Sequence, residues 1–289
     1  MLTRVALALM WLLRLLPLPL LAAIGNAIGA AAFWLVHERR EVARINLAKC
    51  FPAMDPKVRE RIARAHFRVF TRSLLERCIL AWASGERIDR LVRLHGLEHL
   101  RALKGRPVLL LAPHFVGLDA AVTRLTRETR LSGIYALQKD RHLRDFFLRV
   151  RSRFGDTQPI ARQEGIRAAV AAVRGGWPFY YLPDQDYGAR DSVFVPFFGV
   201  PAATVTGLSR LARVTGAKVL PCVTRILPGG AGYEVTIEPA WENFPTADPV
   251  ADTRRMNEYI ERKVLEMPQQ YLWMHKRFKT RPPGEERFY

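Results

Sequence analysis

The spacing of hydrophobic and polar positions divides the chain into three stretches. Residues 15–36, LLPLPLLAAIGNAIGAAAFWLV, carry no charged side chain. In residues 37–83, apolar positions with arginines between them predict helices, and Asp55-Pro56 is a typical helix start because proline suits the first helical position. From about residue 90 onward, short apolar runs alternate with amphipathic stretches.

The alternating stretch predicts a sheet covered by helices. Strands are expected at 107–112, 132–137, 177–182, 217–226 and 233–239. Helices are expected at 117–129, 140–152, 163–174, 201–215 and 250–267. Strands that are apolar on both faces and alternate with helices indicate an α/β fold with a mostly parallel sheet flanked by helices. In such sheets, ligands bind beyond the carboxyl ends of the strands.

Residues 1–36 are the candidate membrane segment. A helix over residues 15–36 is long enough to cross roughly 30 Å of hydrocarbon, although prolines and glycines interrupt it. We expect a membrane anchor that spans the bilayer or lies in its interface, with a cleaved signal peptide and a buried helix pair as the alternatives. Arginines at 39, 40 and 44 follow at once, which places the second expected domain, residues 37–289, in the cytoplasm.

The charge of the chain favours anionic partners. It has 45 Lys and Arg against 27 Asp and Glu, a net charge of +18, which suits nucleic acid, an acidic protein or phosphate-bearing lipid. A nucleic-acid partner is not expected, because the sequence has no recognisable RNA- or DNA-binding motif and such binding would not explain the apolar N-terminus. A non-catalytic membrane scaffold is a second alternative. The three cysteines have no metal-ligand spacing and indicate reduced thiols.

The stretch LLLAPHFVGLDAA, residues 109–121, carries candidate chemistry. His114 follows a predicted strand, and Asp119 is expected in the first turn of the next helix. If His114 lies in the turn between them, the Asp119 carboxylate could orient the imidazole as a general base toward a hydroxyl group. The alternative is an ordinary loop histidine. Asp184 also follows a predicted strand, 177–182.

Other catalytic motifs are missing from the sequence. There is no GxSxG nucleophile, no P-loop, no GxGxxG and no HExxH zinc motif. These absences favour direct transfer of a group to a hydroxyl that His114 activates. We expect no metal and no cofactor.

Several blocks in order carry a family resemblance. They are APHFVGLDA, QPIARQEGIRAAVAAVRGG, YLPDQDYGARDSVFVPFFGVPAATVTG, GAKVLPCVTR and PQQYLWMHKRFKTRPPGE. The sequence resembles the lysophospholipid acyltransferase superfamily, and more closely the bacterial lipid A biosynthesis acyltransferases of the lauroyl and myristoyl type. The resemblance covers nearly the whole chain. Many lipid A enzymes have Glu where this chain has Asp119, which loosens the substrate assignment slightly.

The resemblance implies an activity and a location. It implies a glycerolipid-acyltransferase-like fold and transfer of a fatty acyl chain from acyl carrier protein, or acyl-CoA, to a hydroxyl of a lipid A precursor. His114 and Asp119 would act without an acyl-enzyme. The reaction would occur at the bacterial inner membrane, with the catalytic domain on the cytoplasmic side and facing an anionic leaflet. A glycerophospholipid or aminolipid is the alternative acceptor.

The resemblance also implies roles for further residues. Arg162 would hold phosphate or pantetheine, since a guanidinium makes bidentate phosphate contacts. Asp184 and Asp186 would orient substrate hydroxyls or position loops, and Arg190 would pair with this loop or with substrate. Arg141 begins an arginine-rich stretch, 141–154, that could meet headgroups or carrier protein. Three aromatic residues would line an acyl-chain groove or pack in the core: Phe194, Phe197 and Phe198. Around His275, Trp273 and the neighbouring basic residues are expected to form an interfacial patch.

Overall fold

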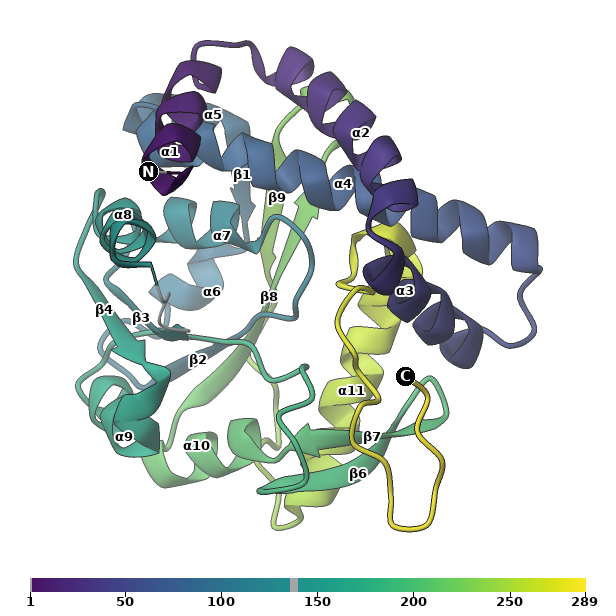
Figure 1. Ribbon diagram of the computed structural model, residues 1–289. Coiled ribbons are helices and arrows are strands. Elements are labelled where there is room, and N and C mark those ends of the chain that lie inside the picture. The colour runs from purple at the N-terminus through teal and green to yellow at the C-terminus, as the bar shows by residue number, and fades with distance from the viewer. Residues whose placement is uncertain (1, 136–139) are drawn as a thin grey trace.

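The computed structural model describes residues 2–135 and 140–289 (Figure 1). Seven strands form the central sheet, in the spatial order β1-β9-β8-β2-β5-β3-β4. Their bounds are β1 Val92–His95, β2 Val108–Leu111, β3 Leu131–Tyr135, β4 Thr157–Ala161, β5 Phe179–Tyr181, β8 Lys218–Ile226 and β9 Tyr233–Ile237. The five strands from β8 to β4 are parallel, whereas β9 runs antiparallel to β8 and β1 is parallel to β9. The predicted mostly parallel sheet is confirmed.

Two hydrophobic layers cover the two faces of this sheet. On β2, Leu109 and Leu111 pack into one cluster, whereas Val108 and Leu110 pack into the other, as the alternation of side chains along a strand requires. The first cluster contains residues of α9 (Gly165–Arg174), α10 (Gly207–Thr215) and α11 (Pro249–Glu266). The second contains residues of α5 (Gly85–Leu91) and α7 (Leu118–Leu125). Helices therefore flank both faces.

The structure adds elements that hydrophobic spacing did not predict. β1 and β4 are additional strands of the main sheet, and β6 (Ser192–Phe197) pairs with β7 (Val200–Val205) in a separate hairpin. The helix expected over 201–215 is therefore wrong in its first part. Phe198 and Gly199 between the two strands both have positive φ, 50° and 78°, which suits a tight hairpin turn. The last two residues of the strand expected at 132–137 lie outside the described residues.

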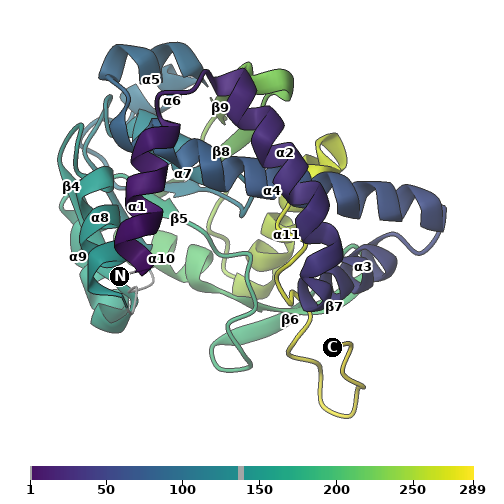
Figure 2. The ribbon, with the colours of Figure 1, turned by 45° about the horizontal axis from the view of Figure 1, so that its top comes forward.

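The chain begins with the helices α1 (Leu2–Leu13), α2 (Leu18–Leu35), α3 (His37–Cys50) and α4 (Pro56–Trp82), which α5 follows before the first strand of the sheet. Figure 2 shows α2 crossing α4, and the two helices are in contact. The approach is close, because a Cβ atom on Gly25 would lie 2.6 Å from the Cα of Arg72, and one on Gly29 would lie 2.5 Å from the Cα of Arg68. The N-terminal helices are therefore packed against the rest of the chain. Asp55 caps α4 as predicted, accepting from the Lys57 N–H.

Candidate active site

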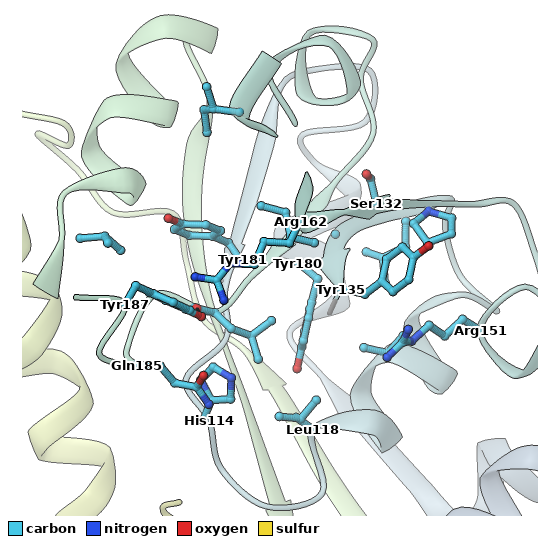
Figure 3. Close-up of a pocket in the computed structure, with 18 of the residues that line it drawn as sticks. His114, Leu118, Ser132, Tyr135, Arg151, Arg162, Tyr180, Tyr181, Gln185 and Tyr187 are labelled. Carbon is cyan, nitrogen blue, oxygen red and sulfur yellow. Dashed lines mark hydrogen bonds between the residues drawn. The ribbon is translucent and has the colours of Figure 1, made fainter. Parts of the chain in front are cut away.

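A cavity of about 960 Å³ lies at the carboxyl edge of the sheet (Figure 3). Its walls include residues at or just beyond the ends of four neighbouring parallel strands: His114 after β2, Leu182 after β5, Tyr135 at the end of β3 and Arg162 after β4. This is where an open α/β sheet binds its ligands. In the described part of the chain, no group of three or more His, Cys, Asp or Glu side chains could hold a metal ion.

His114 and Asp184 form a pair at this edge. Asp184 Oδ1 lies 2.7 Å from Nδ1 of His114, and Asp184 Oδ2 accepts the backbone N–H of His114 at 2.9 Å. The pairing of β2 with β5 explains this contact. Leu111 is opposite Tyr181 at the ends of the two strands, and His114 and Asp184 each lie three residues further along the chain. Within the described chain Nε2 of His114 has no hydrogen-bond partner, and the ring lines the cavity.

The buried Asp184 carboxylate is held in its charged form. Only 1% of this residue is exposed, and burial alone would raise its pKa. The charge of His114, the two hydrogen bonds and the nearby Arg277 guanidinium outweigh burial and lower the pKa below its usual value. An ionised Asp184 keeps the proton of the neutral imidazole on Nδ1, so that Nε2 can act as a base toward the cavity.

Asp119 does not make the contact that the sequence predicted. It lies in the first turn of α7, as expected, and lines the cavity with His114. Its carboxylate, however, pairs with Arg77 of α4, with 2.6 Å between Oδ2 and the guanidinium nitrogen. Asp184 therefore accepts the hydrogen bond from the imidazole that Asp119 was expected to accept, because the loop after β5, rather than α7, lies beside the imidazole.

Three arginines bring positive charge to the cavity. Arg162 lines it beyond β4, with its guanidinium carbon 4.5 Å from the centre of the Tyr187 ring. Arg190 lies at the exposed rim, 3.8 Å from Asp191, so the structure brings two of the three predicted arginines to the cavity. Arg151, from α8 (Arg141–Arg151), is the third.

Arg151 was missed by the sequence analysis. Its guanidinium lies 5.6 Å from the centre of the Tyr135 ring and 5.8 Å from that of Phe147. Burial lowers its pKa, and the Asp119 carboxylate opposes this effect. An arginine nevertheless stays charged at neutral pH. Arg151 is one of several arginines in residues 141–154, and nothing in the spacing distinguishes it. Only the packing of α8 against α4 and α7 brings it to the cavity.

Other predicted site residues lie elsewhere. Arg141 is exposed at the start of α8, outside the cavity lining, and lies 3.7 Å from Asp145. Asp186 is buried and accepts hydrogen bonds from Thr280 and Gly188, so its carboxylate has no free face for a substrate hydroxyl. These contacts suit the other role expected of Asp186, which is to position the loop that follows β5.

The aromatic side chains also differ from expectation. None of Phe194, Phe197 and Phe198 lines the cavity, and Phe197 is fully buried in the core. Trp273 is 1% exposed rather than interfacial, and its indole N–H donates to the carbonyl oxygen of Pro268. His275 lies near the Asp184 loop and accepts a backbone hydrogen bond at Nε2.

Comparison with known proteins identifies the family. Residues 1–280 match the model of the bacterial lipid A biosynthesis acyltransferases. The chain is 32% identical to the lipid A biosynthesis lauroyltransferase of Escherichia coli (strain K12), over 98% of this chain and 93% of that protein. The palmitoleoyltransferase of the same strain is 31% identical, over 100% and 94%. The myristoyltransferase of that strain is 33% identical, over 92% and 82%. The chain therefore belongs to the bacterial lipid A biosynthesis acyltransferases.

Proposed function

We propose that this acyltransferase moves a fatty acyl chain from acyl carrier protein to a hydroxyl group of a lipid A precursor. The observation that carries the proposal is the His114–Asp184 pair, whose imidazole lines a cavity that also contains three arginines. The pair supplies a base for the hydroxyl, and the arginines supply positive charge for an acceptor that bears phosphates. The names of the relatives support lipid A as the acceptor class.

The chemical step follows from the proton positions. Nε2 of His114 takes the proton of the acceptor hydroxyl as its oxygen attacks the thioester carbonyl carbon. The carbonyl becomes a tetrahedral oxyanion, which the positive charges of the cavity stabilise. The oxyanion collapses to the ester, the carbon–sulfur bond breaks, and the departing thiolate takes the proton from His114. No acyl-enzyme forms, and Asp184 stabilises the imidazolium throughout.

The charges of the cavity suit both substrates. Arg162, in the turn that follows β4, and Arg151, at the end of α8, line it from different sides, and each guanidinium can make a bidentate contact with phosphate. Asp119 lies among these arginines, and its pairing with Arg77 reduces its repulsion of an anionic substrate. The net charge of +18 favours association with an acidic carrier protein. Acyl-CoA, which also bears phosphates, is the alternative donor.

We place a membrane anchor in residues 1–36 and the acyltransferase domain in residues 37–289. α2 is long and apolar enough to cross a bilayer, and a third of it is buried against the domain. This N-terminal segment nevertheless exposes large apolar side chains: Val5, Leu9, Trp11, Leu12, Leu15, Leu20, Ile28, Trp34, Leu35 and Val36. The close packing of α2 on α4 supports an anchor that lies in the membrane interface, attached to the domain.

Positive charge lies beside this apolar surface. Thr3 of α1 donates to Asp140, the residue that caps α8, at 2.8 Å, and α8 carries several exposed or half-buried arginines. Figure 2 shows α1 and α8 side by side. Basic residues next to an apolar surface favour an anionic leaflet by about 1 kcal/mol each. We therefore propose the inner membrane as the location, with the domain on its cytoplasmic side.

Vesicle flotation tests this location. We expect the protein to bind vesicles that contain anionic phosphatidylglycerol more strongly than neutral phosphatidylcholine vesicles, and alkaline carbonate to release it, because carbonate extracts interfacial proteins. Equal binding to both vesicles would contradict the role of the arginines. Resistance to carbonate would contradict the interfacial placement and favour a spanning helix.

Acyl transfer by the purified protein tests the activity. Labelled acyl carrier protein is mixed with a lipid A precursor, and wild type is compared with His114→Ala. We expect ester product from the wild type and a loss of about 10²-fold or more in the variant. Activity in both would discard His114 as the base. Transfer only to a glycerophospholipid, or only from acyl-CoA, would replace the proposed acceptor or donor.

A further inference from the structure

A segment near the C-terminus, residues 270–281, runs behind the catalytic pair without lining the cavity. We call it the C-terminal strap. One end binds the loop that carries His114: the N–H of Leu272 donates to the carbonyl oxygen of His114 at 3.1 Å, and the N–H of Val116 donates to that of Gln270 at 2.8 Å. Between these two hydrogen bonds, Phe115 and Tyr271 form an isolated antiparallel β-bridge. The backbone of the strap therefore holds the backbone of the catalytic histidine.

The strap also binds the loop that carries Asp184, through Asp186. Thr280 donates twice to the Asp186 carboxylate, from its backbone N–H at 2.6 Å and from its hydroxyl at 2.8 Å. In the opposite direction, the N–H of Asp186 donates to Nε2 of His275 at 3.0 Å. Asp186 also accepts the N–H of Gly188 at 2.9 Å. The residue two positions after Asp184 is thus bound to the strap from both its backbone and its side chain.

His275 is a permanent acceptor in this arrangement. Because Nε2 accepts a hydrogen bond, the ring is neutral and carries its proton on Nδ1. Burial lowers the pKa of His275 to about 4, and the charges of His114 and Arg277 also lower it, so the ring stays neutral at neutral pH. Its backbone is fixed in turn, since Asn46 of α3 donates to the carbonyl oxygens of Trp273 and His275 at 2.7 and 2.8 Å.

We propose that the C-terminal strap is a positioning element for acyl transfer, which sets the distance between His114 and Asp184 by binding the two loops that carry them. His275 and Thr280 are positioning residues that act on Asp184 through Asp186. The inference rests on the proposed function, because it assigns the strap to the same His114–Asp184 pair. Misplacement of a reacting group by about 1 Å can cost about 10²-fold in rate, so small shifts of these loops matter.

Substitutions of Thr280 test this inference. Thr280→Val keeps the shape of the side chain and removes the hydroxyl that donates to Asp186, whereas Thr280→Ser keeps the hydroxyl. We expect Thr280→Val to lower kcat by about 10-fold or more with KM changed by less than about 2-fold, and Thr280→Ser to restore most of the rate. Thr253→Val is the matched control, since it also removes a hydroxyl that donates within the chain, to Pro249 of α11, away from the cavity.

A second readout does not depend on acyl transfer. The imidazole pKa of His114 is measured by NMR on histidine-labelled protein, with His114→Gln to assign the signal. The groups facing Asp184 that contribute to its electrostatics are His114, Arg277, Tyr271, Tyr187, Tyr180 and His275. Thr280→Val leaves all of these side chains in place. We therefore expect it to shift the titration of His114 only by moving Asp184, whereas Thr253→Val should not shift it.

The outcomes separate this inference from the proposed function. A wild-type protein that makes no product would overturn the proposed function, while the NMR measurement would still test the strap. An active wild type with an unchanged rate and an unchanged His114 titration in Thr280→Val would overturn the positioning role. Equal losses in Thr280→Val and Thr253→Val would also overturn it, because the effect would then be one of stability.

Discussion

The Asp184→Asn substitution tests which of two carboxylates, Asp184 or Asp119, orients the imidazole of His114. Asp184 accepts two hydrogen bonds, from Nδ1–H and from the backbone N–H of His114, at 2.7 and 2.9 Å. An Asn side chain has one acceptor oxygen and one donor nitrogen. If its oxygen accepts the backbone N–H, its amide faces Nδ1 and the imidazole proton moves to Nε2. If the oxygen accepts Nδ1–H, two N–H groups face each other and the loops separate.

The first arrangement removes the base from the cavity, and the second displaces it. With the proton on Nε2, His114 cannot take the proton of the acceptor hydroxyl, and in both arrangements the half-buried imidazolium formed during the reaction loses its counter-charge. The corresponding substitution in a serine-protease triad lowers kcat by about 10⁴-fold. We expect a loss of about 10³–10⁴-fold here, equal to about 4–5.5 kcal/mol of activation free energy.

Steady-state acyl transfer measures this effect, with Asp156→Asn as the control, because Asp156 is exposed just before β4, at the opposite edge of the sheet. Thermal unfolding of Asp184→Asn checks that the buried substitution leaves the protein folded. A folded Asp184→Asn variant within about 5-fold of wild type would refute the orienting role of Asp184. It would return that role to Asp119.

Three further predictions concern binding, packing and pH. Arg162→Gln and Arg151→Gln should each raise the KM of a phosphorylated acceptor by about 10–10²-fold, because a hydrogen bond to a charged group contributes about 1.5–3 kcal/mol; unchanged steady-state KM values would contradict this. Gly29→Val should lower the free energy of unfolding by about 1–3 kcal/mol, since its side chain meets the α4 backbone; an equal effect of Ala27→Val, on the exposed face of α2, would contradict this. Burial lowers the pKa of His66 to about 4, against about 6.5 in the unfolded chain. The unfolded chain therefore binds the extra proton between these values, and the free energy of unfolding should fall by up to about 3 kcal/mol as pH drops from 6.5 to 4. His66→Gln should flatten this slope in urea titrations, and an unchanged slope would contradict the assignment.

The pattern of strands and helices predicts that the site residues lie at the carboxyl edge of the sheet, but it does not predict which strands are adjacent. His114 and Asp184 were both placed after strands, yet their contact depends on β2 and β5 being adjacent, a pairing between distant segments. Hydrophobic spacing contains no information about strand order. Asp119, nearer in sequence, was the natural candidate, but helix geometry turns it toward α4 and Arg77.

The remaining differences have similar physical causes. The sequence predicts part of the β6–β7 hairpin as helix, because PAATVTG has no distinct strand alternation before the helix begins. Arg151 could not be told from the other arginines of 141–154 without the packing of α8. The sequence predicts an interfacial patch around His275 in the strap, since Trp273 and its basic neighbours suit a membrane surface equally well. Tertiary packing decided each case.

The proposed function is tested most directly by the mass of lipid A from a bacterial strain in which the gene for this protein is deleted. We expect lipid A that lacks one acyl chain, and we expect the wild-type gene, but not a gene carrying His114→Gln, to restore it. Unchanged lipid A in the deletion strain would contradict the proposed acceptor. Restoration by the His114→Gln gene would contradict the proposed base.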